Sequence, residues 1–97
     1  MNLLSLNING LGKGDYKVSW VQELVNRHRI AMVGIQETKR RCIEEWTVRK
    51  MWGSIDFDYE FVESEGKGGG LVCFWNKELF QKTEVTKRKD CIIMKGK

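Results

Sequence analysis

The chain has 97 residues, which is enough for one domain at most or for a part of one. Hydrophobic residues make up 41% of the sequence and charged residues 31%, a balance typical of globular proteins and not of disordered ones. The net charge of +4 permits an anionic partner without requiring one. The sequence has neither an apolar run near the ~18 residues that a membrane span needs nor an N-terminal signal-peptide pattern. We therefore expect no membrane association and a nuclear or cytoplasmic, non-secreted protein.

The cysteines argue against a zinc site. Cys42, Cys73 and Cys91 are widely spaced and form no Cys-x-x-Cys pair, and the chain has 1 histidine. We expect three reduced thiols, as in a reducing compartment.

The first part of the sequence predicts a strand, a helix and a second strand. Residues 3–7 form a short apolar run that ends in Asn-Ile-Asn-Gly, which indicates a buried strand followed by a turn. Residues 16–28 have an apolar stripe at helical spacing, with Asp15 as the expected N-cap. The stripe consists of Trp20, Val21, Leu24, Val25 and His28. Residues 30–35 are a second apolar run and predict another buried strand, so the three elements form a right-handed βαβ unit with parallel strands.

The rest of the sequence predicts a short helix and two hairpins. Residues 43–52 fit a helix, and the side chains expected on its inner face are Ile43, Trp46 and either Met51 or the stem of Lys50. Residues 57–62 alternate in polarity like a half-exposed strand, and a Gly-rich connection leads to an antiparallel partner at residues 71–75. Residues 81–86 and 91–94 predict a further hairpin. The expected fold class is therefore α/β, a βαβ unit followed by antiparallel hairpins.

Two polar residues follow the predicted parallel strands. Asn7 ends the first strand and Glu37 follows the second. Because parallel strands end at the same edge of a sheet, these side chains should share the edge where open α/β sheets bind ligands. A carboxylate with amide neighbours such as Asn9 and Gln36 suits a hard cation such as Mg²⁺. The alternatives remain open that Glu37 is a surface acid and that Asn7 and Asn9 are turn residues.

A second interpretation uses the glycines between the first strand and the helix. Gly10, Gly12 and Gly14, followed later by Glu37, resemble a dinucleotide-binding fingerprint. The spacing departs from that fingerprint because Asp15 follows Gly14, and the chain continues as hairpins instead of a third βαβ strand.

Two basic segments complete the picture. Cations outnumber anions in residues 82–97, and Lys39, Arg40 and Arg41 form a shorter basic run. Either segment is a solvated face or a contact for phosphates.

The motifs at the two strand ends resemble a known family. Residues 4–11, L-S-L-N-I-N-G-L, and residues 33–39, V-G-I-Q-E-T-K, resemble the exonuclease–endonuclease–phosphatase superfamily, most closely its abasic-site endonucleases and LINE-type retrotransposon endonucleases. Residues 46–52 and 69–75 are similar to the plant retrotransposon versions. The resemblance implies a four-layer α/β sandwich that hydrolyses phosphodiester bonds with Mg²⁺ or Mn²⁺.

The resemblance also implies roles for individual residues. Glu37 matches the metal-binding glutamate of the family, and Asn7 matches the asparagine that supports the metal, the phosphate and catalysis. Asn9 falls where some members carry Asp, and Lys39 matches the lysine near the site, so both are expected to bind phosphate. The expected partner is DNA.

The family's remaining catalytic motifs, a Tyr, an Asp-x-Asn pair and an Asp-His pair, find no match in this sequence. Residues 1–97 are therefore expected to be a truncated, N-terminal part of the domain, inactive alone and with weak or lost DNA binding. An unclosed sheet should leave part of the surface of its apolar residues wet and promote self-association. The residues expected to be exposed in this way are Phe57, Tyr59, Phe61, Val72 and Phe74. The alternative function is a non-catalytic basic module that binds nucleic acid or a protein.

Overall fold

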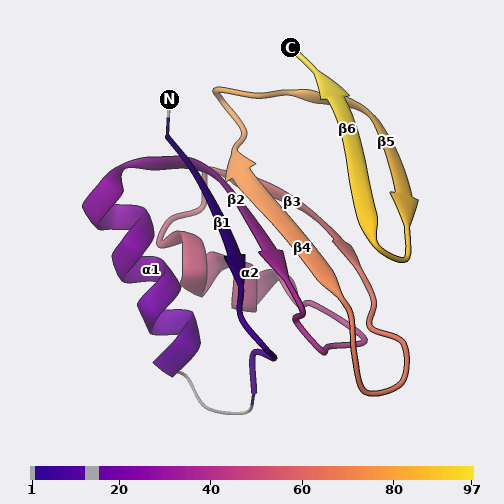
Figure 1. The fold of residues 1–97 in the computed structure, drawn as a ribbon. Helices are drawn as coiled ribbons and strands as arrows, with labels where there is room; N and C mark the ends of the chain where they lie inside the picture. The colour runs from indigo at the N-terminus through magenta and orange to yellow at the C-terminus, as the bar shows by residue number, and fades with distance from the viewer. Residues whose placement is uncertain (1, 13–15) are drawn as a thin grey trace.

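The protein is a mixed α/β fold with two helices and six strands within the described residues (Figure 1). The structure, a computed structural model, describes residues 2–12 and 16–97. In chain order the elements are β1 (Asn2–Asn7), α1 (Tyr16–His28), β2 (Ile30–Gln36), α2 (Glu45–Trp52), β3 (Phe57–Val62), β4 (Leu71–Asn76), β5 (Lys82–Arg88) and β6 (Cys91–Gly96). No helix in this part of the chain is both long enough and apolar enough to cross a bilayer.

Four strands form the main sheet in the order β1-β2-β4-β3, and β5 and β6 form a separate hairpin. β1 pairs with β2 in parallel, whereas β2 with β4 and β3 with β4 are antiparallel. Helix α1 makes the crossover that a parallel pair requires. The predicted βαβ unit and both predicted hairpins are therefore confirmed.

The hydrophobic core lies between the sheet and the two helices. Val33 and Ile35 of β2 and Phe74 of β4 point to this face, where Val21 of α1 and Met51 of α2 meet them, and all of these residues are almost fully buried. Figure 1 shows both helices on one side of the sheet, with the β5–β6 hairpin away from them. One sheet face thus carries the core.

This one-sided covering corrects several sequence-based expectations. β1 is an edge strand with Leu3 67% exposed, so it is not a buried strand. His28 is exposed, and Trp20 of the expected stripe is 46% exposed. Trp46 points outward and is 58% exposed, because α2 buries a different face of its helix. That face consists of Thr47, Val48, Met51 and Trp52. The predicted cap at position 15 lies outside the described residues.

The helices cover the apolar residues of β3 and β4 to different extents. Val72 and Phe74 are almost completely buried, and Phe57, Tyr59 and Phe61 pack against the same core. The reason is the alternation of side chains along β3 and β4, which turns these five residues toward the helices. The expectation of partly wet surface is therefore wrong for Val72 and Phe74, whereas Phe57, Tyr59 and Phe61 remain partly exposed.

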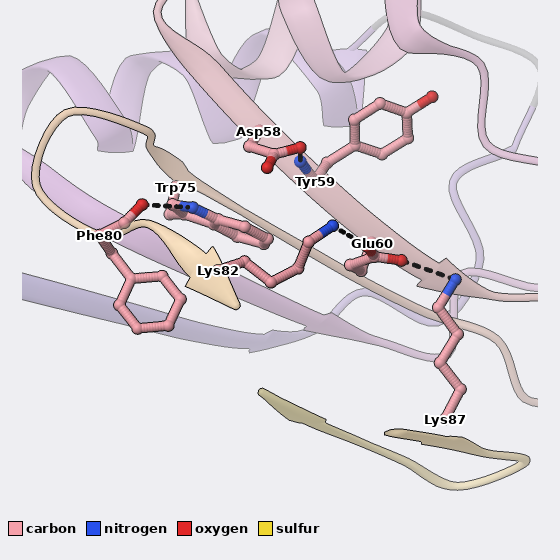
Figure 2. Close-up of polar contacts among 7 residues, drawn as sticks. All are labelled: Asp58, Tyr59, Glu60, Trp75, Phe80, Lys82 and Lys87. Atoms are coloured by element: carbon pink, nitrogen blue, oxygen red, sulfur yellow. Dashed lines mark hydrogen bonds and ion pairs between the residues drawn. The ribbon is translucent and has the colours of Figure 1, made fainter. Parts of the chain in front are cut away.

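The other face of the sheet is partly covered by the segment that leads into the β5–β6 hairpin. The indole nitrogen Nε1 of Trp75 donates to the carbonyl of Phe80 at 3.1 Å, and the two rings pack edge-on (Figure 2). Glu60 of β3 accepts hydrogen bonds from Lys82 and Lys87 of β5, the second at 2.7 Å (Figure 2). The ion triad Glu60–Lys82–Lys87 therefore fastens the hairpin to the sheet.

The Glu60 carboxylate is 13% exposed, so its protonation state matters for stability. Burial raises the pKa of Glu60, but the hydrogen bonds from Lys82 and Lys87 act in the opposite direction and prevail, leaving the pKa below its ordinary value. A carboxyl whose folded-state pKa is depressed stabilises the fold above its unfolded pKa. This contribution disappears as the pH falls through the folded-state pKa.

We expect Glu60→Gln to lower the free energy of unfolding at neutral pH by about 1–2 kcal/mol, because it removes the charge that both lysines face. Urea unfolding measures this loss. The difference between wild type and variant should shrink as the pH drops below ~4.3, the ordinary value for a glutamate. Glu84→Gln is the matched control, because Glu84 lies in the same hairpin, 63% exposed and 4.0 Å from Lys95. Equal losses in the two variants at neutral pH would contradict the anchoring role of Glu60.

Candidate functional site

Three loops meet at the carboxyl edge of β1 and β2, and backbone hydrogen bonds join them. We call this region the loop junction; it comprises residues 8–11, 37–39 and 69–70. The amides of Ile8, Gly10 and Leu11 donate to the carbonyls of residues 36, 37 and 38 at 3.1, 2.6 and 3.0 Å. The amides of residues 38 and 39 donate to the carbonyls of residues 70 and 69 at 3.2 and 2.9 Å. The loop after β2 is therefore held between the other two.

The loop junction concentrates unusual backbone geometry. Asn9, Glu37 and Lys39 adopt φ angles of 50°, 58° and 55°, and among the described non-glycine residues only Arg29 shares this conformation. A left-handed conformation costs about 1–2 kcal/mol for an L-residue. Such strain persists only where surrounding contacts enforce it, and it clusters at functional sites.

Glu37 lies half-buried at the centre of the loop junction. Its Oε2 atom accepts a hydrogen bond from the amide of Gly69 at 3.2 Å. Its Oε1 atom has no hydrogen-bond partner within the described part of the chain. The loop that precedes β4 thus orients the carboxylate and leaves one oxygen available to a ligand.

The two asparagines have local partners. Asn7 is paired in register with Gln36, so its backbone lies beside the residue that precedes Glu37. The Oδ1 atom of Asn7 accepts from the amide of Asn9 at 3.2 Å, which is the turn contact expected of this residue type. The structure thus supports the turn interpretation of Asn7. It also places Asn7 at the same sheet edge as Glu37, without a side-chain hydrogen bond between them among the described residues.

Lys39 and Asn9 are brought together. The Nζ atom of Lys39 donates to Oδ1 of Asn9 at 2.7 Å, and both side chains are exposed. Two of the residues expected to bind phosphate therefore lie side by side.

Lys17, which the sequence did not single out, supports the same loop. Its Nζ atom donates to the carbonyls of Ile8 and Gly10 at 2.9 and 2.6 Å. Arg40 adds a hydrogen bond to the carbonyl of Gly12 at 2.8 Å. These contacts surround a pocket of 430 Å³ that is lined by Asn9, Gly10, Gly12, Lys17, Lys39 and Arg40. The pocket carries three cations and one amide, which suits an anion.

The donor set favours one type of metal ion. The described residues contain no group of three or more His, Cys, Asp or Glu side chains that could hold a metal. A structural zinc site uses three or four such ligands, which the described residues do not bring together. Mg²⁺ commonly binds through one or two carboxylates, retains several waters and bridges to substrate phosphates. The Glu37 carboxylate, at the same strand ends as the Asn7 amide, fits that pattern.

Other candidate groups have no part in this arrangement. His28 ends α1 at the opposite edge of the sheet, where its carbonyl accepts from the Asn2 side chain. Burial, with a smaller effect of Glu60, raises the pKa of the Cys73 thiol to about 11, so this thiol is protonated at neutral pH. The dinucleotide interpretation loses support, because β2 pairs on the side away from β1 with the antiparallel β4 and not with a third parallel strand. Position 14 of that pattern lies outside the described residues.

No protein-family model matches this chain, and no curated protein matches it significantly.

The close approach of the loops depends on a glycine at position 70. A Cβ atom on Gly70 would lie 2.2 Å from Oγ1 of the buried Thr38 and 3.2 Å from the Lys39 amide, and its φ is 92°. We expect Gly70→Ala to lower the free energy of unfolding by about 3 kcal/mol through backbone strain and overlap. Gly69→Ala is the matched control, because its φ is 77° but nothing lies within 4 Å of the added carbon.

The control should lose only about 1 kcal/mol, the strain of the left-handed conformation alone. Urea unfolding of both variants measures the difference. Equal losses would show that the contact between Gly70 and Thr38 does not constrain the loop junction.

Proposed function

We propose that the loop junction is the metal- and phosphate-binding part of a Mg²⁺-dependent phosphodiesterase site of the exonuclease–endonuclease–phosphatase type, with DNA as the substrate class. The observation that carries the proposal is the placement of Glu37 at the carboxyl edge of β1 and β2, with one oxygen held by Gly69 and the other without a hydrogen-bond partner among the described residues. The proposal includes the four-layer sandwich implied by the sequence motifs, of which the helices and the main sheet would form two layers.

The residues at this sheet edge would have different roles in such a site. Glu37 would hold the metal ion, and the Asn7 amide at the neighbouring strand end would assist it. Asn9 and Lys39 would contact the phosphate. When bound, Mg²⁺ would stabilise the negative charge that develops on a phosphate under attack.

Phosphodiester hydrolysis also needs a group that activates water. The described residues offer none at this edge: the histidine lies at the opposite edge and the carboxylates do not cluster. The described residues would therefore supply the groups that bind the metal and the phosphate but not the group that activates water. We expect the chain to bind the metal without cleaving DNA.

A non-catalytic basic module, with residues 82–97 as its binding surface, is the second candidate. The structure weakens it, because Lys82 and Lys87 are paired with Glu60 and Lys95 lies 4.0 Å from Glu84. The charge of this segment is thus partly neutralised within the chain. In the pocket beside the loop junction, Arg40 lies 3.9 Å from Glu44, but Lys17 and Lys39 have no acidic partner among the described residues and are the better anion contacts.

We expect Mg²⁺ and Mn²⁺ to bind weakly at one site, and Glu37→Gln to abolish this binding, because an amide oxygen lacks the charge that the ion requires. Isothermal titration calorimetry measures both proteins. Glu65→Gln is the control, since Glu65 is an exposed acid of the adjoining loop and its loss should leave the affinity unchanged. Binding that survives Glu37→Gln would contradict the proposed metal ligand.

We expect no cleavage when the purified chain is incubated with Mg²⁺ and plasmid or abasic-site DNA, since the water-activating group is missing. Agarose gels detect nicking with high sensitivity. Nicking that Glu37→Gln eliminates would show that the chain holds a complete catalytic site, contrary to this expectation.

A further inference from the structure

Two aromatic side chains stand exposed beside Asn7. Tyr16 is 74% exposed and Trp20 is 46% exposed, and their spacing of four residues places them on the same face of α1. The opposite face of the helix supplies Val18, Val21 and Val25 to the core. The aromatic pair is therefore not needed to attach the helix to the sheet.

The aromatic pair borders a pocket of its own. This pocket has a volume of 400 Å³ and is lined by Asn7, Ile8, Tyr16, Lys17 and Trp20. It thus joins the aromatic rings to the strand end that carries the candidate metal ligand Asn7.

This aromatic pocket adjoins the 430 Å³ pocket beside the loop junction, which we call the basic pocket. Lys17 lines both, and the loop after β1, whose carbonyls it holds, contributes Ile8 to the first pocket and Asn9 to the second. One pocket offers aromatic rings and the other offers Lys39 and Arg40. A nucleotide has the matching polarity, with a flat base at one end and an anionic phosphate at the other.

We propose that Tyr16 and Trp20 stack against an unpaired base of single-stranded nucleic acid, while the adjoining backbone phosphate lies in the basic pocket near Lys39 and Arg40. The assignment of phosphate to that pocket rests on the proposed function, whereas the stacking needs no metal ion. Proteins that bind single strands combine exposed aromatic residues with cations that follow the backbone.

The charge of the site and the nature of base stacking favour this occupant. The cations beside the rings complement a polyanion and would repel a basic peptide. In a duplex the base faces are already stacked, and extruding a base costs several kcal/mol. An unpaired strand presents its bases without that cost.

The test measures the affinity of labelled oligonucleotides by fluorescence anisotropy in EDTA, so that metal binding does not contribute. The probes are a short oligothymidylate, an oligouridylate, an abasic strand of equal length and a duplex. We expect at least one of the single strands that carry bases to bind about ten-fold more tightly than the abasic strand and the duplex. The oligothymidylate and the oligouridylate distinguish DNA from RNA.

Substitutions locate the contact. Trp20→Leu should weaken binding of the preferred single strand about ten-fold while leaving the abasic strand unaffected. Trp46→Leu is the matched control, since Trp46 is also exposed and has Lys50 over its ring, but lies on α2. It should bind like wild type, and circular dichroism confirms that both variants are folded.

Equal affinity for base-carrying and abasic strands, tighter binding of the duplex, or equal effects of the two substitutions would overturn the inference. None of these results would bear on the proposal that Glu37 binds a metal ion, because the assay contains no metal ion. Conversely, a failure to detect Mg²⁺ binding by calorimetry would not affect the conclusion on base stacking.

Discussion

The parallel pairing of β1 with β2 is the constraint on which the site depends. Helix α1 returns the chain to the start of the sheet, so both strands run in the same direction and end at one edge (Figure 1). Asn7 and Glu37, far apart in the sequence, therefore become neighbours along that edge. With antiparallel strands, the two residues would lie at opposite ends of the pair.

Beyond the strand ends, contacts among the three loops position the side chains of the site. The left-handed backbone of Asn9, Glu37 and Lys39 is unfavourable alone, and the hydrogen bonds among the three loops offset its cost. Lys17 adds to this by donating to the carbonyls of residues 8, 9 and 10 in the first loop. Strained backbone that is held in place by surrounding contacts is typical of a site that must present groups to a ligand.

The periodicity of the sequence predicted the main features of this fold, because the apolar run of β2 and the stripe of α1 contain the core residues Val33, Ile35, Val21 and Val25. The stripe also included Trp20 and His28, which are exposed. The predicted burial of Trp46 is wrong. That prediction placed Trp46 on the same helical face as Ile43, but Ile43 precedes α2, which begins at Glu45. The burial of β1 was overestimated because an apolar run does not reveal which sheet face the helices cover. The edge that carries Asn7 and Glu37 followed from topology. The Lys17 contacts and the approach of Gly70 to Thr38 did not, since side-chain contacts to backbone carbonyls and loop-to-loop packing leave no periodic pattern.

The central claim is that the loop junction binds a divalent cation through Glu37, and paramagnetic NMR tests it most directly. Substoichiometric Mn²⁺ added to ¹⁵N-labelled protein broadens the amide signals nearest the bound ion. The account predicts that the amides of Glu37, Thr38 and Gly69 broaden first, with Asn7 and Asn9 close behind. Broadening centred on another acidic segment, such as Glu63 and Glu65, or spread evenly over the surface would contradict it.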